Sequence, residues 1–562
     1  MGPATSIRVD AELESGPRHN SFCSTAGRAG ATGTGSAHTP SRSQSLLPGL
    51  GGVELPSLPA VVLSSRGARH NPRSMSTLEI RVDNRIRVPA DGLPGKALKR
   101  LRESCTHENP DFKKRKARGY ATYNVPAEIR TYRLEEGGEE HSFPRGAMGR
   151  VRSVLRELGI PYRVKDARTE GAPLLHPLEY RAKDRPPRSY QREAAMKALE
   201  VEQGVVRAAT GSGKTTTAIY AATLFGLNTL VVLPNVKLLK QTKEVAEKLL
   251  GTEIGIIRGK TKKLRPFTVA TQQTLWSRKT IEEDVRGYFG AVIFDEAHHA
   301  AARTFQHVID QFSCRYRIAF TADERRKDRK EFLVYDAFGQ PIHEMTREQC
   351  EALGVVVDVE IRIVFSDFRA DWYRKDPDFN AFLELATADE KRNDLILETA
   401  LAEIRSGEQV IVCSHRREHA RVLDAALIAH CVQSGVMLGG EEAGDAREFE
   451  STREGLLDGT VSVGVGTYGA LGEGIDLPAV SVGVAATPIF NNEQMLNQYR
   501  GRLCRTADGK TKGRLYAIFD RKVFDQRMLS NLLRWNRNVL VRTRKGKWID
   551  ARSRPARAIM KV

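Results

Sequence analysis

The feature that most constrains this chain is a glycine-rich octapeptide set between an apolar run and a helix-prone run. Residues Ala208–Thr215 read AATGSGKT and continue directly from the apolar run Val205–Ala209. Two glycines separated by one residue let the backbone turn its N–H groups toward one point. The helix that follows directs the positive end of its dipole to the same point. Strand, loop and helix together predict a phosphate-binding loop.

The side chains of this loop indicate what it binds. Lys214 is expected to reach the β and γ phosphates of a nucleoside triphosphate, and the Thr215 hydroxyl to ligate Mg²⁺. The remaining loop residues are expected to contact the same cofactor; they are Thr210, Gly211, Ser212, Gly213 and Thr216. ATP and Mg²⁺ are therefore the predicted cofactors.

Short apolar strands alternate with helical periodicity around this loop. The first series predicts strands at Val205–Ala209, Thr229–Leu233, Phe267–Thr271, Ala291–Phe294 and Arg317–Phe320, with a helix at Val236–Leu250. A second series predicts strands at Gln409–Ser414, Val461–Val465, Ser481–Ala485 and Leu515–Phe519. Alternation of this kind produces a parallel sheet covered by helices on both faces. The chain is expected to contain two such α/β lobes in tandem.

Composition divides the chain further. Residues 1–74 contain 29 Gly, Ser or Pro and predict a disordered, low-complexity tail; translation from Met75 and an organellar targeting peptide are alternatives. Residues 75–182 predict a small mixed α/β accessory module. Residues 183–350 and 351–526 are assigned to the two lobes. Residues 527–562 are expected to form a helix and a basic C-terminal tail.

The net charge of +19 over 562 residues favours a polyanionic partner, chiefly nucleic acid. No apolar run approaches the roughly 20 residues of a membrane span, so a membrane partner is not expected. The seven cysteines contain no C-x-x-C pair, which favours reduced thiols over disulfides or a zinc site.

One basic segment, NPDFKKRKARGYATYNVP, interleaves aromatic residues with lysines and arginines. Lys113, Lys114 and Arg115 are candidate phosphate contacts, and the aromatic rings could stack on bases. A solvated basic helix with its aromatic rings turned inward is an equally good interpretation. In a eukaryotic protein the same run could act as a nuclear import signal.

A pair of carboxylates, Asp295 and Glu296, follows the predicted strand Ala291–Phe294. Ligand groups gather at the carboxyl ends of parallel strands. Asp295 is therefore expected to hold Mg²⁺ through water, with Glu296 orienting and deprotonating the attacking water. His298 is a candidate bridge to the other lobe.

The second lobe contains QYRGRLCR, from Gln498 to Arg505. Arg502 and Arg505 are three residues apart and share one face if this segment is helical. Guanidinium groups directed at a γ-phosphate would stabilise transition-state charge. The three elements predict a composite active site that is complete only when the lobes close.

These motifs resemble those of superfamily 2 helicases over about residues 185–525, and the resemblance implies two RecA-like domains. In SYQREAAMKAL it implies that Gln191 reads adenine. In LVVLPNVKLLKQT and VATQQTLW it implies nucleic-acid contacts by Pro234, Lys237, Thr271 and Gln272. In QVIVCSHRREHA and VGTYGALGEGIDLP it implies strand contacts by His415, Arg416 and Thr467, and ATP-coupled contacts by Gly474 and Asp476.

Two details bear on the branch of this superfamily. Gln498 begins the arginine motif where RNA-unwinding DEAH proteins usually have histidine, which favours the DNA-acting branch of XPB-like, type III restriction-like and phage UvsW-type enzymes. The coupling motif departs from the usual Thr-Ala-Thr-Pro, since Asp323 and Glu324 follow Thr321 and Ala322. ATP hydrolysis is therefore a safer prediction than strand separation.

Four functions compete. The first is an ATP-dependent DNA helicase or translocase acting on duplex or branched DNA. The second is the motor subunit of a restriction complex with a separate nuclease, and the third is an RNA helicase. The fourth, a nucleic-acid-binding scaffold without ATPase activity, is disfavoured by the intact Lys214 and Glu296. A recombination protein is a further candidate partner. The cytoplasm of a bacterium or phage-infected host is the expected location, or the nucleus in a eukaryote.

Overall fold

The computed structural model describes residues 77–560 except 136, 278–280, 298–302, 323–328, 375–377, 440–442, 473–476, 490–491, 525 and 544. All of these residues belong to one compact unit, Pro72–Val562. Among the helices in this part of the chain, none combines the length and apolar character needed to cross a bilayer. The described chain contains three principal sheets, one for each predicted α/β module.

The N-terminal module is built on a five-stranded sheet in the order β5-β6-β2-β1-β7. Its strands are β1 (Leu78–Val82), β2 (Arg85–Pro89), β5 (Arg133–Leu134), β6 (Glu140–Pro144) and β7 (Tyr162–Asp166). The helices α1 (Gly95–Ser104) and α3 (Met148–Glu157) contribute their apolar faces to its core, with Ala97, Leu101, Val151 and Leu155 fully buried. Alternation along β1 places Leu78, Ile80 and Val82 in that core.

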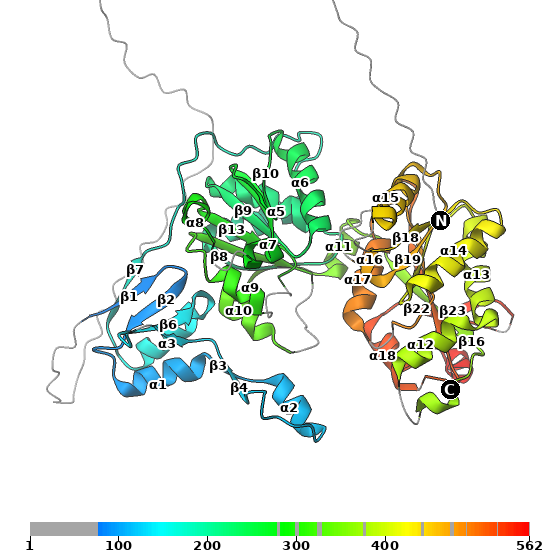
Figure 1. Ribbon diagram of the computed structural model, residues 1–562, viewed down its shortest axis with the longest axis horizontal. Coiled ribbons are helices and arrows are strands. Elements are labelled where there is room, and N and C mark those ends of the chain that lie inside the picture. The colour runs from blue at the N-terminus through cyan, green and yellow to red at the C-terminus, as the bar shows by residue number, and fades with distance from the viewer. Residues whose placement is uncertain are drawn as a thin grey trace, which may run out of the picture. The chain divides into compact units, whose positions relative to one another are not determined.

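A two-stranded ribbon and a helix extend this module. Strands β3 (Thr106–Glu108) and β4 (Glu128–Arg130) pair antiparallel, and α2 (Pro110–Ala117) lies between them in the chain. Asn109 caps α2 by accepting a hydrogen bond from the Asp111 N–H at 3.1 Å. We call residues Thr106–Arg130 the arm; Figure 1 shows it extending away from the five-stranded sheet.

Lobe one contains an eight-stranded sheet in the order β11-β10-β12-β9-β13-β14-β8-β15. Its pairs are parallel except the β10–β11 hairpin. Its strands are β8 (Gln203–Ala208), β9 (Thr229–Leu233), β10 (Gly255–Arg258), β11 (Thr261–Lys263), β12 (Phe267–Thr271), β13 (Ala291–Phe294), β14 (Tyr316–Thr321) and β15 (Pro341–Met345).

The helices of lobe one lie around this sheet (Figure 1). They are α4 (Ser189–Val201), α5 (Lys214–Phe225), α6 (Val236–Leu250), α7 (Gln272–Ser277), α8 (Glu283–Tyr288), α9 (Arg303–Ile309), α10 (Glu331–Phe338) and α11 (Arg347–Ala352). Every residue of β9, β12 and β13 is buried, which explains why these strands appear in the sequence as unbroken apolar runs.

Lobe two repeats the architecture with the strand order β18-β19-β17-β20-β21-β16-β22-β23. Its strands are β16 (Val359–Ser366), β17 (Val410–Ser414), β18 (Ser434–Met437), β19 (Val463–Thr467), β20 (Val482–Ala485), β21 (Gly513–Asp520), β22 (Val539–Arg542) and β23 (Trp548–Asp550). Its helices are α12 (Phe379–Ala388), α13 (Glu390–Arg405), α14 (Arg417–Ala429), α15 (Ala443–Asp458), α16 (Tyr468–Gly472), α17 (Glu493–Leu503), α18 (Gln526–Trp535) and α19 (Arg554–Ile559). The predicted fold class, two tandem parallel-sheet lobes behind a small α/β module, is confirmed.

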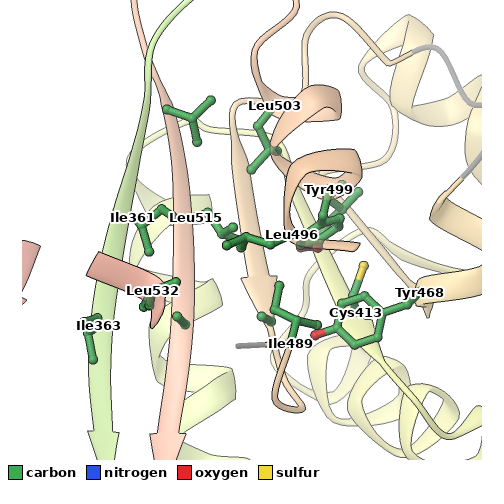
Figure 2. Packing of buried hydrophobic residues seen from close by; sticks show 14 of the residues in the cluster. Ile361, Ile363, Cys413, Tyr468, Ile489, Leu496, Tyr499, Leu503, Leu515 and Leu532 are labelled. Atoms are coloured by element: carbon green, nitrogen blue, oxygen red, sulfur yellow. Dashed lines mark hydrogen bonds between the residues drawn. The ribbon is translucent and has the colours of Figure 1, made fainter. Parts of the chain in front are cut away.

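The packing of α17 determines which of its residues are left for a site. Leu496, Tyr499 and Leu503 recur at helical spacing and are buried among lobe-two residues (Figure 2). The Tyr499 hydroxyl donates to the Ile411 carbonyl oxygen at 3.1 Å. Because this face is committed to the core, the remaining faces of α17 carry Gln498 and Arg502.

The C-terminal segment differs from the predicted helix and basic tail. The helix is present as α18, but β22 and β23 then extend the lobe-two sheet. Val539 and Val541 are buried and pair with Ile361 and Ile363 of β16. The many lysines and arginines of this segment obscure its short apolar alternation in the sequence.

The N-terminal module is joined to lobe one by buried polar contacts. The Asp336 carboxylate on α10 accepts a hydrogen bond from the Thr131 hydroxyl at 2.5 Å, pairs with Arg150 and lies 2.9 Å from His107 Nε2. Arg145 donates to the carbonyl oxygen of Cys314 at 2.7 Å. Such contacts fix the module on the lobe that carries the predicted phosphate loop.

Candidate active site

The predicted phosphate loop lies between β8 and α5, as the sequence indicates. α5 is a 12-residue helix that starts at Lys214, so its first N–H groups face the loop. Gly211 and Gly213 have φ angles of +90° and +85°. A Cβ atom on Gly213 would lie 2.5 Å from Gln191 Nε2, and one on Gly211 would lie 2.9 Å from Val356 Cγ1. Both positions therefore require glycine, for conformation and for space.

Lys214 and the carboxylate pair meet at this loop. Lys214 Nζ lies 3.5 Å from Glu296 Oε1, with both side chains mostly shielded from solvent. Asp295 is buried directly after β13, and its Oδ1 accepts the Glu296 N–H at 2.9 Å. Glu296 has a φ of +50°, an unusual conformation for a non-glycine residue and one that clusters at functional sites. The strand end therefore presents two carboxylates to the phosphate loop.

Gln191 is held against the same loop. Its Nε2 donates to the carbonyl oxygens of Ser212 and Gly213 at 3.2 and 3.4 Å, and its Oε1 accepts the Arg188 N–H at 2.8 Å. The Ser212 side chain is buried, and its hydroxyl has no hydrogen-bond partner among the described residues. Gln191 thus lies beside the predicted cofactor site, and its reading of adenine stays a prediction.

The arginine motif of lobe two approaches this loop. Cys504 Sγ donates to the Thr210 carbonyl oxygen at 3.7 Å. A Cβ atom on Gly501 would lie 2.5 Å from Thr210 Cγ2, so the backbone of α17 lies closely against the Thr210 side chain of the loop. Burial lowers the pKa of Arg505 to about 10, which leaves its guanidinium charged at neutral pH. The two lobes therefore share one site.

A cavity of about 650 Å³ joins these elements, within the roughly 300–1,000 Å³ common for small-molecule sites. Every described residue predicted for catalysis, metal or cofactor binding lines it, except the buried Ser212: these are Gln191, Thr210, Gly211, Gly213, Lys214, Thr215, Thr216, Asp295, Glu296, Gln498, Arg502 and Arg505. Among the described residues that line the cavity, seven are Lys or Arg and four are Asp or Glu. This cationic excess suits a polyanion such as a triphosphate.

The same residues fit the two predicted cofactors. The loop glycines and the start of α5 provide backbone N–H donors for phosphate oxygens. Thr215 and Asp295 offer one hydroxyl and one carboxylate, the sparse donor set typical of Mg²⁺ bound together with phosphates. No cluster of three or more His, Cys, Asp or Glu suited to a metal occurs among the residues that the structure describes.

Some predicted residues lie outside the described residues. They are Gly474 and Asp476, predicted to contact ATP; His298, the candidate bridge; and Asp323 and Glu324 of the coupling motif.

The predicted strand contacts of lobe one lie in different surroundings. Pro234 and Thr271 line a separate groove of about 510 Å³ together with Arg258. Gln272 Nε2 donates to the Thr304 hydroxyl at 2.8 Å. Lys237 lies instead against lobe two and does not line the groove. Of the four residues that the sequence predicts to contact nucleic acid in lobe one, Pro234 and Thr271 therefore share this groove.

The predicted strand contacts of lobe two lie at the ends of its strands. His415 Nδ1 lies 2.8 Å from the Thr487 hydroxyl, and the Thr467 hydroxyl accepts the Ala470 N–H at 3.3 Å. Burial, with a smaller effect of Arg416, lowers the pKa of His415 to about 4. His415 is therefore neutral at neutral pH and would contact a strand without adding charge. Lys113, Lys114 and Arg115 are exposed on α2, apart from this set.

Sequence reasoning missed several cations of the main cavity, among them Arg185, Arg188 and Arg347. Arg185 and Arg188 come shortly before Gln191 in the chain, so their charge was a usable signal. Arg347 begins α11 and donates to Glu351 at 2.7 Å. Its place depends on the tertiary fold, which no local motif reveals.

Comparisons with known proteins agree with these motifs. A family model described as "Type III restriction enzyme, res subunit" matches residues 184–325. The chain is 28% identical to "DNA 3'-5' helicase XPB" of Mycobacterium tuberculosis over 384 residues, covering 64% of this chain and 65% of that protein. It is 26% identical to "Probable helicase D10" of Escherichia phage T5 over 312 residues, covering 54% of this chain and 65% of that protein.

This chain therefore spans just under two thirds of the length of these curated relatives. Among solved structures, the crystal structure of T4 UvsW is similar, with 16% identity, a TM-score of 0.38, and coverage of 83% of this chain and 99% of that chain.

Proposed function

We propose that the chain is a member of the DNA-acting branch of the superfamily 2 helicases, and that it is a DNA-dependent ATPase that translocates along or remodels duplex or branched DNA. One observation carries the proposal: Lys214, Glu296, Arg502 and Arg505 line a single cavity formed by both lobes. Because both lobes line the cavity, its geometry changes when the lobes move. ATP binding and hydrolysis in the cavity can therefore alter how tightly the lobes hold a nucleic-acid strand.

In the proposed reaction ATP would supply the transferable γ-phosphoryl group, and a bound Mg²⁺ ion would neutralise charge on its phosphates. Lys214 and the backbone N–H groups of the loop bind phosphate oxygens. Thr215 would hold this ion directly and Asp295 would hold it through water. Glu296 orients the attacking water and accepts its proton.

Arg502 and Arg505 complete the reaction from lobe two. Their guanidinium groups stabilise the charge that develops on the γ-phosphate oxygens during transfer. Because they come from the other lobe, hydrolysis depends on lobe closure, and release of the products permits opening. Alternate closing and opening would move a bound strand.

DNA is the preferred substrate class. The XPB relative is named as a DNA helicase, and this chain has a net charge of +19. The lobe-one groove with Pro234, Thr271 and Arg258 offers a path for a phosphate backbone. Backbone contacts contain little base information, so we expect low sequence specificity.

A motor subunit of a restriction complex is the second candidate, because the matching family model carries that description. Among the described residues no cluster of three or more acidic or histidine side chains suits a nuclease metal. Cleavage in this case would need a partner. Capture of a DNA-cleaving activity by the purified chain would favour this candidate over a motor that acts alone.

ATP turnover tests the proposal. We would measure it with no nucleic acid, single-stranded DNA, duplex DNA, forked DNA and RNA. DNA should stimulate turnover, and Glu296→Gln should lower kcat by about 10²–10⁴. Lys214→Ala should abolish turnover. Lys197→Ala is the matched control; it removes a lysine from the exposed face of α4 and should leave turnover unchanged.

Stimulation by RNA alone would assign the chain to RNA. No turnover under any of these conditions would leave only a scaffold without ATPase activity.

A further inference from the structure

The arm exposes two tyrosines that lie outside every apolar core of the described chain. Tyr120 and Tyr123 are 62% and 86% exposed, and no residue of α2 is buried. The aromatic rings are therefore not turned inward, which rules out one of the two sequence interpretations for these side chains. A tyrosine ring is a large apolar surface, and two of them held in solvent near one helix favour a recognition role.

The arm also carries unbalanced positive charge. Between Thr106 and Arg130 there are six Lys or Arg and three Asp or Glu residues. Each acid already has a basic partner; the pairs are Glu108–Lys113, Asp111–Lys330 and Glu128–Arg130. Lys114, Lys116 and Arg118 have no acidic partner among the described residues. These cations lie within a few residues of the exposed tyrosines.

The base of the arm is fixed to lobe one. The His107 ring stacks on Phe332 with 4.2 Å between ring centres, and His107 Nε2 lies 2.9 Å from Asp336 Oδ2. Lys330 Nζ donates to Asp111 Oδ2 at 2.7 Å. All three lobe-one partners lie on or next to α10. The arm is thus anchored to the ATP-binding lobe, and a ligand bound by the arm would be held near that lobe.

We propose that the arm binds an unpaired strand of DNA, with Tyr120 and Tyr123 stacking on bases and Lys114, Lys116 and Arg118 neutralising phosphates. This inference rests on the proposed DNA motor and adds the state of the strand it engages. Bases within a duplex are stacked on one another, whereas unpaired bases present their faces to aromatic side chains. Lysines and arginines alone would bind the phosphates of duplex and single-stranded DNA alike. The tyrosines are therefore the residues expected to favour the single strand.

The test measures binding of the full chain to a fluorescent single strand and to a blunt duplex, by anisotropy and without nucleotide. Tyr123→Ala should weaken single-strand binding about tenfold, since stacking of one base on an aromatic ring contributes strongly to such affinity. Duplex affinity should stay the same. Tyr123→Phe keeps the ring and should bind as the unaltered chain does.

A second pair of variants tests the cations. Lys114→Gln combined with Lys116→Gln should lower the slope of log affinity against log salt by about 1.4 on single strands. Lys96→Gln combined with Lys99→Gln removes the same charge from the exposed face of α1 and is the matched control. Unchanged salt dependence in the arm variant would overturn the phosphate contacts.

The stacking role is overturned if Tyr120→Ala and Tyr123→Ala bind single strands as tightly as the unaltered chain, or lose single-strand and duplex affinity equally. Because these measurements contain no ATP, they do not depend on turnover. A chain that never hydrolyses ATP would refute the proposed motor and leave the binding result intact. Thermal unfolding of each variant shows whether it is folded.

Discussion

Lys237 of lobe one donates a hydrogen bond to the carbonyl oxygen of Ala470 in lobe two at 3.1 Å. Its ammonium also lies 3.9 Å from the centre of the Phe449 ring. A lysine that the sequence predicts to contact nucleic acid therefore joins the lobes in this arrangement. If Lys237 binds a strand as the sequence predicts, strand binding and this contact between the lobes would exclude each other.

The Lys237 contact predicts a pH dependence of lobe docking. Burial, together with the charge of Arg502, lowers the pKa of Lys237 to about 7; Glu450 raises it and Arg453 lowers it further. An exposed lysine has a pKa near ~10.4. Between these values the docked state binds fewer protons, so docking should strengthen as pH rises from about 7 to about 10. Energy transfer between two fluorophores, one on each lobe, measures the docked fraction at each pH.

Lys237→Met keeps most of the apolar stem and removes the titrating group, so it should abolish this dependence. A docked fraction that is flat across the window in the unaltered chain would contradict the assignment.

Arg502 of α17 and Arg505, which follows the end of that helix, should act on turnover more than on affinity. Arg505→Ala or Arg502→Ala is expected to lower kcat by about 10³–10⁵, because transition-state charge loses its partner. Nucleotide affinity should change far less. Steady-state turnover and binding of a fluorescent nucleotide separate these effects. Arg447→Ala, exposed on α15, is the matched control; equal losses in kcat and affinity would point to a structural role.

The two ends of α5 offer a paired test of the phosphate loop. Gly213 and Gly226 both have left-handed φ angles, but only Gly213 has a neighbour close to where a Cβ would lie. Gly226→Ala should cost about 1 kcal/mol of stability and retain nucleotide binding. Gly213→Ala should lose nucleotide binding as well. Thermal unfolding with and without ATP measures both, and a ligand-induced shift retained in Gly213→Ala would refute the loop assignment.

The buried Asp336 carboxylate should stabilise the joint between the N-terminal module and lobe one. Asp336→Asn breaks its pair with Arg150 and should cost roughly 3 kcal/mol. Burial alone would raise the pKa of Asp336, yet His107, Arg150 and Thr131 bring it below its usual value. Its contribution is therefore present above pH ~4 and lost as pH falls through the lowered value.

Denaturant unfolding at neutral and acidic pH measures this contribution. Glu103→Gln removes an exposed charge paired with Lys99 in the same module and should change stability by less than about 1 kcal/mol. Equal effects of the two substitutions would contradict the role of Asp336.

The sequence predicts best where burial is complete. Thr229–Leu233, Phe267–Thr271 and Ala291–Phe294 have the predicted bounds because strands buried on both faces leave uninterrupted apolar runs. The apolar pattern predicts that Val461 lies in a strand, but its N–H donates to the Gly455 carbonyl oxygen at 2.9 Å, so it belongs to the turn after α15. β16 and the β10–β11 hairpin were missed.

In the candidate site, too, the residues beside buried strands could be predicted, whereas contacts between the lobes could not. Lys214, Asp295 and Glu296 follow from motifs beside buried strands, since such strands fix where the next residues lie. The docking of Lys237 on Ala470 depends on how two lobes meet, and no local pattern contains that information. The predicted strand contacts and domain boundaries stay predictions.

Gly501 has a consequence for how near lobe two can come. Its α-hydrogen faces Thr210, with no room for a methyl group between them. The methyl group of an alanine at this position would push α17 away from Thr210. Arg502 and Arg505 would then lie farther from the proposed nucleotide site, although both would still be present. The lack of a side chain at Gly501 thus allows α17 to lie directly against the Thr210 side chain of lobe one.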